Sequence, residues 1–430
     1  MKENIYDLLG IGIGPFNLSL AALLSPLNEL NIKFCDNKKE LQWHPELLFD
    51  DAPMQTSFLK DLVTPVDPTN ACSFMNYLVE NGQFYHFLNT SRNVITRYEF
   101  DEYLKWSSRK LNPVLDFNSE ILEVKRENNL LKISKSDGEY FARNICIASG
   151  PVQNIPEPAK KYLGSNVFHA KSKEIQNLNL SNKRVLIVGG GQTGIEIFRN
   201  ALNSKWGKCR EIKLITGREN LLPLEEGPFT NEIFSPDFVS NFYELPQETK
   251  DSFTERLLLT SDGNTPSYLQ ELYNELYLDK FYKKEFSSYS IEPMRWLKDI
   301  SKIDNSYCAM IENKLNHSLE EYKTDIIILA TGFKSKLPSF LESLKNEIFF
   351  DDQGRFRISH DYKLKTKMKD NCIYAMNYSR HGHGIADPQT SLMSWRSAII
   401  ANSLLKREQY KNTQQNLSFI QYFSQRNNYE

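Results

Sequence analysis

Short apolar runs alternate with glycine turns and segments of helical composition along much of the chain. The first run ends at Leu9 and leads into the turn Gly10 to Asn17, and residues 18–24 then have the composition of a helix. A second run, residues 184–188, is rich in β-branched side chains and leads into the turn Gly189 to Gly194. Continuous apolar runs of this kind are typical of buried parallel strands. Both places therefore predict a strand, a tight turn and a helix.

The first turn is close to the dinucleotide fingerprint G-x-G-x-x-G. Gly10 and Gly12 take the first two glycine positions, Gly14 follows, and Pro15 stands where the third glycine is expected. Glycine lets the backbone approach a pyrophosphate, and a helix N-terminus offers free N–H groups. A proline is tolerated there because its missing N–H would have no partner. Asp36 ends the next apolar run, at about the position where an acid binds an adenosine ribose.

The second turn matches the fingerprint in full, with the candidate cofactor-binding residues Gly189, Gly191, Gln192, Thr193 and Gly194. The following strand, residues 211–216, ends in Gly217-Arg218 and not in an acid. An acid would favour the ribose hydroxyl of NAD, whereas an arginine can pair with the 2′-phosphate of NADP. Two fingerprints with different partners favour two dinucleotides, FAD at the first and NADPH at the second. The alternative is one nucleotide domain with a degenerate copy.

The rest of the pattern suggests how the two units are joined. Helices are expected to start near residue 73 and to cover residues 98–109, 265–278 and 391–404, and strands are expected at 324–329 and 373–377. The strand before Ala148-Ser149-Gly150 and the strand before Ala330-Thr331-Gly332 both end in small-residue turns. Between residues 221 and 286 the α/β alternation breaks, and we expect it to resume before residue 324.

We therefore predict an α/β protein with two Rossmann-like dinucleotide-binding domains and a smaller, mostly helical substrate-binding insertion. The FAD-binding domain is expected to comprise residues 1–165 and 332–430, and the NADPH-binding domain residues 166–225 and 284–331. The insertion is expected at residues 226–283.

Composition narrows the class of protein. With 430 residues, 40% hydrophobic and 25% charged, the chain has the composition of an ordinary globular protein. Its net charge of −2 gives no reason to expect nucleic acid as a partner. The six cysteines show no C-x-x-C spacing, so neither a disulfide framework nor a metal site is indicated. No signal peptide and no apolar run of bilayer length is seen, so a cytoplasmic enzyme without a transmembrane segment is expected.

Longer motifs carry a resemblance to a known family. They are Gly10 to Asn17, Trp43-His44-Pro45, Met54-Gln55, Phe58 to Leu62, Pro68-Thr69, Asn76 to Leu78, Gly189 to Gly194, Asn231-Glu232 with Phe234, Thr260 to Gly263, Ala330 to Gly332, His383-Gly384 and Ser391-Leu392. On these residues the chain resembles the flavin-dependent N-hydroxylating monooxygenases of siderophore biosynthesis, and most closely the L-lysine N6-monooxygenase branch. Pro15 is usual in that family.

The resemblance implies a reaction. NADPH would reduce FAD, O₂ would add to the reduced flavin to give a C4a-hydroperoxide, and the terminal primary amine of L-lysine would attack it to give N6-hydroxylysine for a hydroxamate siderophore. The amine must be neutral, and a dry pocket lowers its pKa from about 10.4. The family also implies a homo-oligomer. The sequence leaves open whether NADH is accepted and which siderophore receives the product.

The resemblance also assigns roles. Gln55 would lie beside the flavin and the nicotinamide and Asn231 near the nicotinamide ribose, both as catalytic and cofactor-binding residues. Lys60 would pair with the substrate carboxylate, and Asp262 could pair with an ammonium group or cap the following helix. The remaining cofactor-binding candidates are Trp43, His44, Thr331, Gly332, His383 and Ser391. For His383 and its neighbour His381, a structural role is the alternative.

Other functions compete with this one. Ornithine enzymes tend to carry Thr-Asn-Tyr where this chain has Thr260 to Gly263, which argues against ornithine. If Lys60 binds a carboxylate, an amino acid is favoured over putrescine or cadaverine, and histamine is a further amine to consider. A disulfide reductase is disfavoured by the missing redox cysteine pair. A flavin-binding scaffold without turnover remains a hypothesis of a different class.

Overall fold

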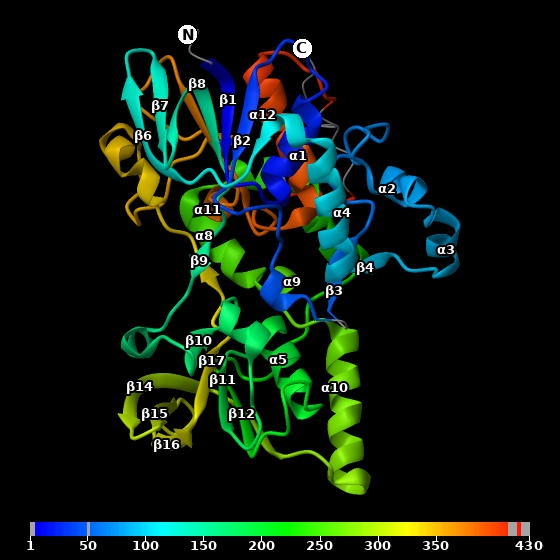
Figure 1. Cartoon of the computed structure of the whole chain (residues 1–430), viewed down its shortest axis with the longest axis vertical. Coiled ribbons are helices and arrows are strands. Elements are labelled where there is room, and N and C mark those ends of the chain that lie inside the picture. The colour runs from blue at the N-terminus through cyan, green and yellow to red at the C-terminus, as the bar shows by residue number, and fades with distance from the viewer. Residues whose placement is uncertain (1–4, 50–51, 412–418, 423–430) are drawn as a thin grey trace.

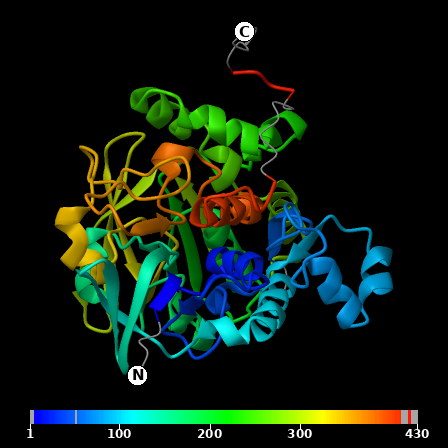
Figure 2. The same cartoon turned by 90° about the horizontal axis from the view of Figure 1, so that it is seen from above.

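A computed structural model describes residues 5–49, 52–411 and 419–422. It has two halves, each built on its own sheet, with helices between and around them (Figure 1). Seen from above, α2 and α3 project from one side of the half that carries the N-terminus (Figure 2). None of the described helices is long and apolar enough to cross a membrane.

The first half is built on a seven-stranded sheet. Its central strand β1 pairs in parallel with β2 and β8, and β6 and β7 extend the sheet as an antiparallel meander from β8. The strand β19 returns from the C-terminal part of the chain to pair in parallel with β8. In spatial order the strands are β5 (Leu115–Asp116), β2 (Ile32–Cys35), β1 (Ile5–Ile11), β8 (Gly138–Ile147), β7 (Leu130–Lys135) and β6 (Ile121–Glu127), with β19 (Cys372–Ala375) on β8.

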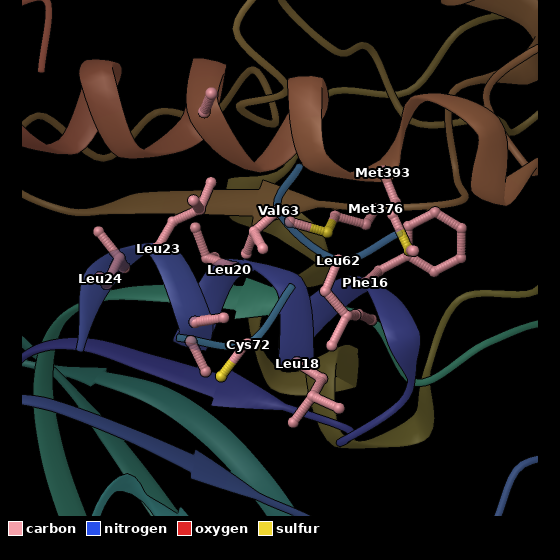
Figure 3. Close-up of a cluster of buried hydrophobic side chains, with 14 of the residues drawn as sticks. Phe16, Leu18, Leu20, Leu23, Leu24, Leu62, Val63, Cys72, Met376 and Met393 are labelled. Carbon is pink, nitrogen blue, oxygen red and sulfur yellow. The ribbon is translucent and has the colours of Figure 1, made fainter. Parts of the chain in front are cut away.

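Helix α1 lies at the centre of this half. It runs over Pro15–Leu24, and all ten of its residues are buried. One side packs on the sheet and another packs against α12 (Met393–Leu405), with Leu20, Val63 and Met393 among the side chains between them (Figure 3). Each fully buried side chain of this size contributes about 1.5–3 kcal/mol. The C-terminal helix thereby holds the first glycine turn and its helix in place.

The second half contains a five-stranded, all-parallel sheet. Its order is β10 (Val167–His169), β17 (Ile326–Leu329), β11 (Arg184–Val188), β12 (Glu211–Thr216) and β13 (Ser288–Pro293). Helix α5 (Gln192–Leu202) follows the second glycine turn and packs on β11 and β12. Two sheets with parallel central strands, each with a strand, a glycine turn and a helix, confirm the predicted α/β class.

Short helices dominate the segment between β12 and β13. They are α6 (Pro228–Asn231), α7 (Pro236–Tyr243), α8 (Gln247–Arg256), α9 (Leu259–Asp262) and α10 (Pro266–Leu278). The helix expected at 265–278 is therefore present, with Thr265 as its N-cap residue. Elsewhere the chain forms α2 (Phe74–Glu80), α3 (Phe84–Asn89), α4 (Arg97–Lys110) and the single-turn α11 (Arg380–His383).

Two small sheets have two strands each. β9 (Val152–Gln153) pairs with β18 (Phe333–Lys334) where the chain passes between the halves, and β3 (Pro53–Ser57) pairs with β4 (Val94–Thr96). Short 3₁₀ turns occur at η1 (Pro45–Leu47), η2 (Asn112–Val114), η3 (Glu157–Tyr162), η4 (Lys173–Asn177), η5 (Glu232–Phe234), η7 (Ser339–Glu347) and η8 (Thr390–Leu392), and η6 (Asp279–Lys283) is a π-helical turn.

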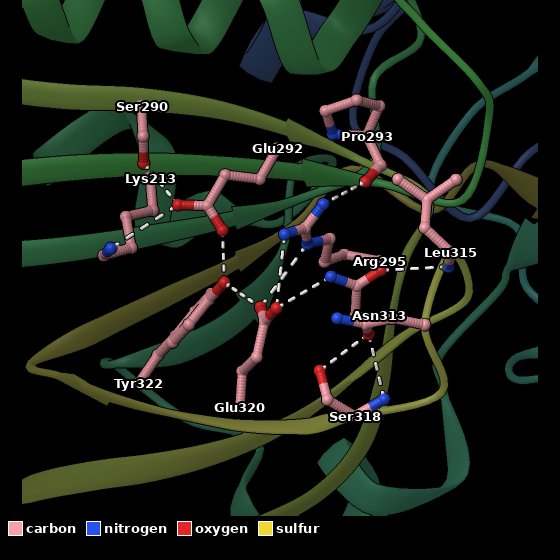
Figure 4. A network of polar contacts seen from close by, with 11 residues as sticks. Lys213, Ser290, Glu292, Pro293, Arg295, Asn313, Leu315, Ser318, Glu320 and Tyr322 are labelled. Atoms are coloured by element: carbon pink, nitrogen blue, oxygen red, sulfur yellow. Dashed lines mark hydrogen bonds and ion pairs between the residues drawn. The ribbon is translucent and has the colours of Figure 1, made fainter.

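One expectation about the second half is wrong. The α/β alternation does not resume between residues 284 and 324; after β13 the chain forms the antiparallel sheet β14 (Arg295–Ile303), β15 (Ser306–Asn313) and β16 (Leu319–Thr324). A polar network ties this sheet to β13 (Figure 4). The Tyr322 hydroxyl donates to Glu292 and also contacts Glu320, and Arg295 pairs with Glu320 at 3.2 Å.

Candidate active site

The first glycine turn requires glycine at one position and leaves open space at another. Gly12 has φ +91°, and a Cβ there would lie 2.7 Å from the carbonyl oxygen of Ala148. Gly14 is the N-cap of α1, has no side-chain cap, and would have no atom within 4 Å of an added Cβ. The Asn17 amide donates to the Gly12 carbonyl at 2.8 Å and fixes the turn. An uncapped helix N-terminus facing open space fits the pyrophosphate of FAD.

Asp36 lies at the end of β2, as the sequence pattern predicts. Its two carboxylate oxygens accept hydrogen bonds from the backbone N–H groups of Ile13, at 2.7 Å, and Lys38, at 2.9 Å. The carboxylate therefore ties the turn after β2 to the first glycine turn. A carboxylate has acceptor sites beyond these two, so Asp36 can still accept a hydrogen bond from a ribose hydroxyl. That contact stays a prediction.

The second glycine turn is packed more tightly. A Cβ on Gly189, where φ is +122°, would lie 2.1 Å from the Ala330 carbonyl oxygen, and one on Gly194 would lie 1.9 Å from the Gly189 carbonyl oxygen. Gly191 is the uncapped N-cap of α5 and faces open space. The residues of this turn therefore fit a second pyrophosphate, that of NADPH, in the same way as the first turn fits FAD.

A cavity of about 1250 Å³ lies between the two halves. Of the sequence-predicted residues it is lined by Trp43, His44, Gln55, Lys60, Gly189, Gly191, Gln192, Thr193, Arg218, Asn231, Asp262, Thr331, Gly332 and Ser391. Its lining does not include Gly10, Gly12, Gly14, Pro15, Asp36, Gly194 or His383. The structure thus brings together residues far apart in the sequence, from both halves, the helical segment between β12 and β13, and the C-terminal part of the chain.

His383 is enclosed instead of facing this cavity. Its ring stacks on Tyr362 with centroids 4.1 Å apart, Nδ1 contacts the Ser379 hydroxyl, and Nε2 lies 3.2 Å from the His360 carbonyl oxygen. Burial lowers the pKa of His383 to about 3, so it is neutral. His381 lies 2.8 Å from the Phe356 carbonyl oxygen. These placements support a structural role for both histidines, which was the alternative to cofactor binding.

His44 lies in the cavity wall in an uncommon conformation. Its φ of 50° is in the left-handed region, and its ring meets that of Trp43 edge to face at 4.9 Å. Burial, with nearby Lys171 and Arg97, lowers the pKa of His44 to about 3. The Nδ1 atom is buried without a hydrogen-bond partner among the described residues. His44 can therefore offer a neutral nitrogen to a bound molecule, but it cannot carry a proton near neutral pH.

Several polar side chains of the cavity are held by one another. The Gln55 amide donates to the Thr265 hydroxyl at 3.2 Å, and Arg218 donates to the backbone oxygen of Asp262 at 2.9 Å. The carboxylate of Asp262 pairs with Arg380 at 3.0 Å. Asp262 is the last residue of α9, so the expectation that it caps the next helix is wrong, because Thr265 takes that position. Asp262 is also neutralised by Arg380, which weakens the case for an ammonium partner.

Other predicted residues are less constrained. Asn231 ends α6 and is exposed in the cavity wall. The Ser391 hydroxyl is buried with no hydrogen-bond partner in the described part of the chain. The Thr331 hydroxyl donates to the Asn154 carbonyl at 2.5 Å and so fixes the turn after β17. The buried Ser391 hydroxyl is thus available to a bound molecule, whereas the Thr331 hydroxyl is already used.

Lys60 is the most informative cation in the cavity. It follows β3, it is half-buried, and no ion pair joins it to any described residue. Burial lowers the pKa of Lys60, because desolvation disfavours the charged form. A desolvated ammonium without an acidic partner is suited to bind an incoming carboxylate.

Among the cavity residues that the sequence pattern missed, two are cations beside His44. Lys171 follows β10, its pKa is also lowered by burial, and its Nζ lies 5.4 Å from the centre of the Phe333 ring. Arg97 begins α4 and pairs with Glu196 of α5. Neither belongs to a recognisable motif, and a single lysine or arginine in a sequence is usually a solvated surface residue.

Comparisons with known proteins agree with this geometry. A family model described as L-lysine 6-monooxygenase/L-ornithine 5-monooxygenase matches residues 4–335. The L-lysine N6-monooxygenase of Escherichia coli is 37% identical over 410 residues, which cover 95% of this chain and 96% of that protein. The putrescine N-hydroxylase of Shewanella oneidensis is 30% identical and covers 94% of this chain and 82% of its own.

Solved structures are also similar. A cadaverine monooxygenase of Erwinia amylovora bound to FAD has a TM-score of 0.91 at 25% identity and covers 98% of this chain and 99% of its own. An ornithine N-hydroxylase of Kutzneria sp. 744, with reduced FAD, NADP⁺ and L-ornithine, has a TM-score of 0.86 at 26% identity and covers 94% of this chain and 99% of its own.

We expect Lys60 to lose its proton at a lower pH than the bulk of the lysines, because burial disfavours the charged ammonium. Reductive ¹³C-methylation followed by an NMR pH titration measures each lysine, and the variant Lys60→Arg identifies the Lys60 signal by its loss. Titration of this signal together with the main group of lysines would contradict the expectation.

Proposed function

Because the chain belongs to the L-lysine 6-monooxygenase/L-ornithine 5-monooxygenase family, we propose that it hydroxylates the terminal primary amine of L-lysine to N6-hydroxylysine. The chain is a flavin N-monooxygenase that uses FAD and NADPH, and its products serve siderophore biosynthesis. The overall reaction consumes one amine, one O₂, one NADPH and one proton, and it releases a hydroxylamine, NADP⁺ and water. The observation that supports lysine is the unpaired, desolvated Lys60 in the shared cavity.

The two glycine turns divide the cofactors between the halves. The first turn, with Gly14 at its open face, would hold the FAD pyrophosphate, and the second, with Gly191, would hold that of NADPH. Bound FAD, reduced by NADPH, would supply the chemistry that activates O₂, so that one oxygen atom goes to the amine and the other leaves as water. The protein's part is to bind, to orient and to exclude water.

Residues of this chain would prepare the amine. Lys60 would bind the α-carboxylate and so direct the side chain of the substrate into the cavity. The surrounding apolar wall, including Phe16 and Phe234, would disfavour the charged ammonium and leave the amine neutral. Gln55 and the buried Ser391 hydroxyl would hydrogen-bond the reacting groups, and Asn231 would contact the nicotinamide ribose; their positions in the cavity lining support these roles.

Diamines are the main alternative substrates. Similar proteins act on putrescine and cadaverine, and others on ornithine, by their names. A diamine has no carboxylate, and its use would leave the Lys60 ammonium desolvated and without a counter-charge. Lys60 therefore favours lysine over putrescine, cadaverine and histamine. Ornithine also has a carboxylate, and the segment Thr260 to Gly263 is what argues against it.

The organisation of the chain is part of the proposal. We assign FAD to residues 1–165 and 332–430, NADPH to residues 166–225 and 284–331, and substrate contacts to the insertion 226–283. We further propose a cytoplasmic location and a homo-oligomeric state.

Replacing Lys60 by methionine should raise KM for L-lysine by roughly tenfold to a hundredfold, as expected when a charged hydrogen bond of about 1.5–3 kcal/mol is lost. Turnover of cadaverine should change little, because it makes no carboxylate contact. KM for lysine and the turnover of cadaverine are measured by hydroxylamine formation and O₂ uptake, with ornithine, putrescine and histamine as further substrates. Faster turnover of a diamine than of lysine by the unmodified enzyme would overturn the choice of substrate.

Binding of lysine should also weaken as pH rises through the lowered pKa of Lys60. Above that pKa, Lys60 loses the charge that binds the carboxylate, so KM for lysine should increase. Cadaverine has no carboxylate, so the loss of this charge should not raise its KM.

Replacing Arg218 by alanine should raise KM for NADPH by roughly tenfold to a hundredfold, because one charge-assisted contact to the 2′-phosphate is removed. KM for NADH should stay nearly constant, since NADH lacks that phosphate. Anaerobic flavin reduction by each nucleotide measures the two effects. An equal loss with both would place Arg218 in support of the fold, through its bond to Asp262, and not at the phosphate.

A further inference from the structure

A buried ion pair joins the two halves directly. Arg97, the first residue of α4, and Glu196, in the second turn of α5, form two parallel hydrogen bonds of 2.9 and 3.0 Å. The Glu196 side chain is fully buried, and that of Arg97 is 15% exposed. A bidentate pair of this kind fixes orientation as well as distance.

The pair continues into a chain of hydrogen bonds along the cavity wall. The Gln192 amide donates to Glu196 at 2.8 Å, and its oxygen accepts from the backbone N–H of Thr265 at 2.8 Å. The Thr265 hydroxyl in turn accepts from Gln55 at 3.2 Å. One network therefore connects β3 and α4 of the first half, α5 of the second half, and the start of α10.

One end of this network lies beside the second glycine turn, and the other end holds the segment around His44 in the cavity wall. Arg97 also donates through its backbone to Ala52 at 3.0 Å and through its guanidinium to Leu47 at 3.4 Å, which holds the segment around His44. At the other end, Gln192 directly follows Gly191, the N-cap that faces the second pyrophosphate site. Helix α4 also packs against α1, the helix that follows the first glycine turn. A shift of α5 relative to α4 would therefore move one cofactor site relative to the other.

We propose that Arg97, Glu196 and Gln192 form a latch between the two dinucleotide-binding halves, and that it sets the distance from the nicotinamide to the flavin. The proposal rests on the proposed function, in which NADPH reduces FAD across the cavity. The three are positioning residues. The Gln192 side chain takes part in the latch, and its cofactor-binding role stays a prediction. Removing the charge of either partner leaves the other buried without compensation, so the halves should loosen at this point.

Hydride transfer is sensitive to such a change. Reacting atoms must approach to about 3–3.5 Å, and a misplacement of about 1 Å costs on the order of a hundredfold in rate. The reaction of reduced flavin with O₂ involves no hydride transfer from the nicotinamide, so the latch should not affect its rate. A loss of positioning should slow flavin reduction by NADPH alone, whereas a general loss of structure should also slow reoxidation by O₂.

The test uses the FAD-loaded enzyme and the variant Glu196→Gln, which keeps the size of the side chain and its hydrogen bond to Gln192. Anaerobic stopped-flow reduction by NADPH should be roughly tenfold to a hundredfold slower than in the unmodified enzyme. FAD content and the rate at which dithionite-reduced enzyme reoxidises in air should be unchanged. Hydrogen exchange should rise in residues 192–202 and stay constant in β1 and β8.

Arg97→Gln and the double variant complete a mutant cycle, in which the two effects on flavin reduction should be strongly non-additive because they break the same contact. Arg97→Lys keeps the charge and loses the bidentate geometry, so its rate of flavin reduction should lie between those of the unmodified enzyme and Glu196→Gln. If Glu196→Gln fails to retain FAD, the rate of Arg97→Lys tests the latch in its place. Arg92→Gln is the matched control, since Arg92 forms a bidentate pair with Glu99 inside the first half, at 2.9 and 2.6 Å.

Flavin reduction at the unmodified rate in Glu196→Gln, or in Arg97→Lys where that variant decides, would overturn the latch. Purely additive effects in the cycle, or an equal loss in Arg92→Gln, would overturn it as well. Failure of NADPH to bleach the flavin of the unmodified enzyme would instead contradict the proposed function.

Discussion

The structure depends on two close approaches between backbone segments. At each glycine turn, a strand end from elsewhere in the same sheet comes so near that a Cβ would collide with its carbonyl: Ala148 against Gly12, and Ala330 against Gly189. Each of these alanines begins a small-residue turn from which the chain crosses to the other half. The same contact that shapes a cofactor site therefore also fixes where the chain leaves it, and the paired strands β9 and β18 carry both crossings side by side.

This arrangement explains how one cavity collects residues from the whole length of the chain. The second glycine turn and Phe16, which follows the first glycine turn, line it from opposite halves, and the helical segment between β12 and β13 and the C-terminal part of the chain close its sides. Its cations differ in their surroundings: Arg97 is paired with Glu196 and Arg380 with Asp262, whereas Lys60 has no acidic partner among the described residues. Paired cations hold the walls in place, and Lys60 remains available for a ligand with a carboxylate.

Much of this could be predicted from sequence because it is local. Gly10 to Asn17 and Gly189 to Gly194 determine backbone geometry within a few residues, and the periodicity of residues 265–278 determines a helix. The antiparallel sheet β14 to β16 was missed because β14 starts directly after the parallel strand β13, and no glycine turn marks the change of sheet. The latch between Arg97 and Glu196 could not be found in this way, because a buried pair between distant segments leaves no local pattern. The roles of the individual site residues stay predictions.

The central claim is that one cavity holds the flavin, the nicotinamide and an amino acid whose carboxylate is bound by Lys60. A crystal structure of the enzyme with FAD, NADP⁺ and L-lysine tests it most directly. The account predicts a lysine carboxylate oxygen about 3 Å from the Lys60 Nζ, with the terminal amine directed toward the flavin. A lysine bound in the reverse direction, or with its carboxylate on Lys171, would contradict it.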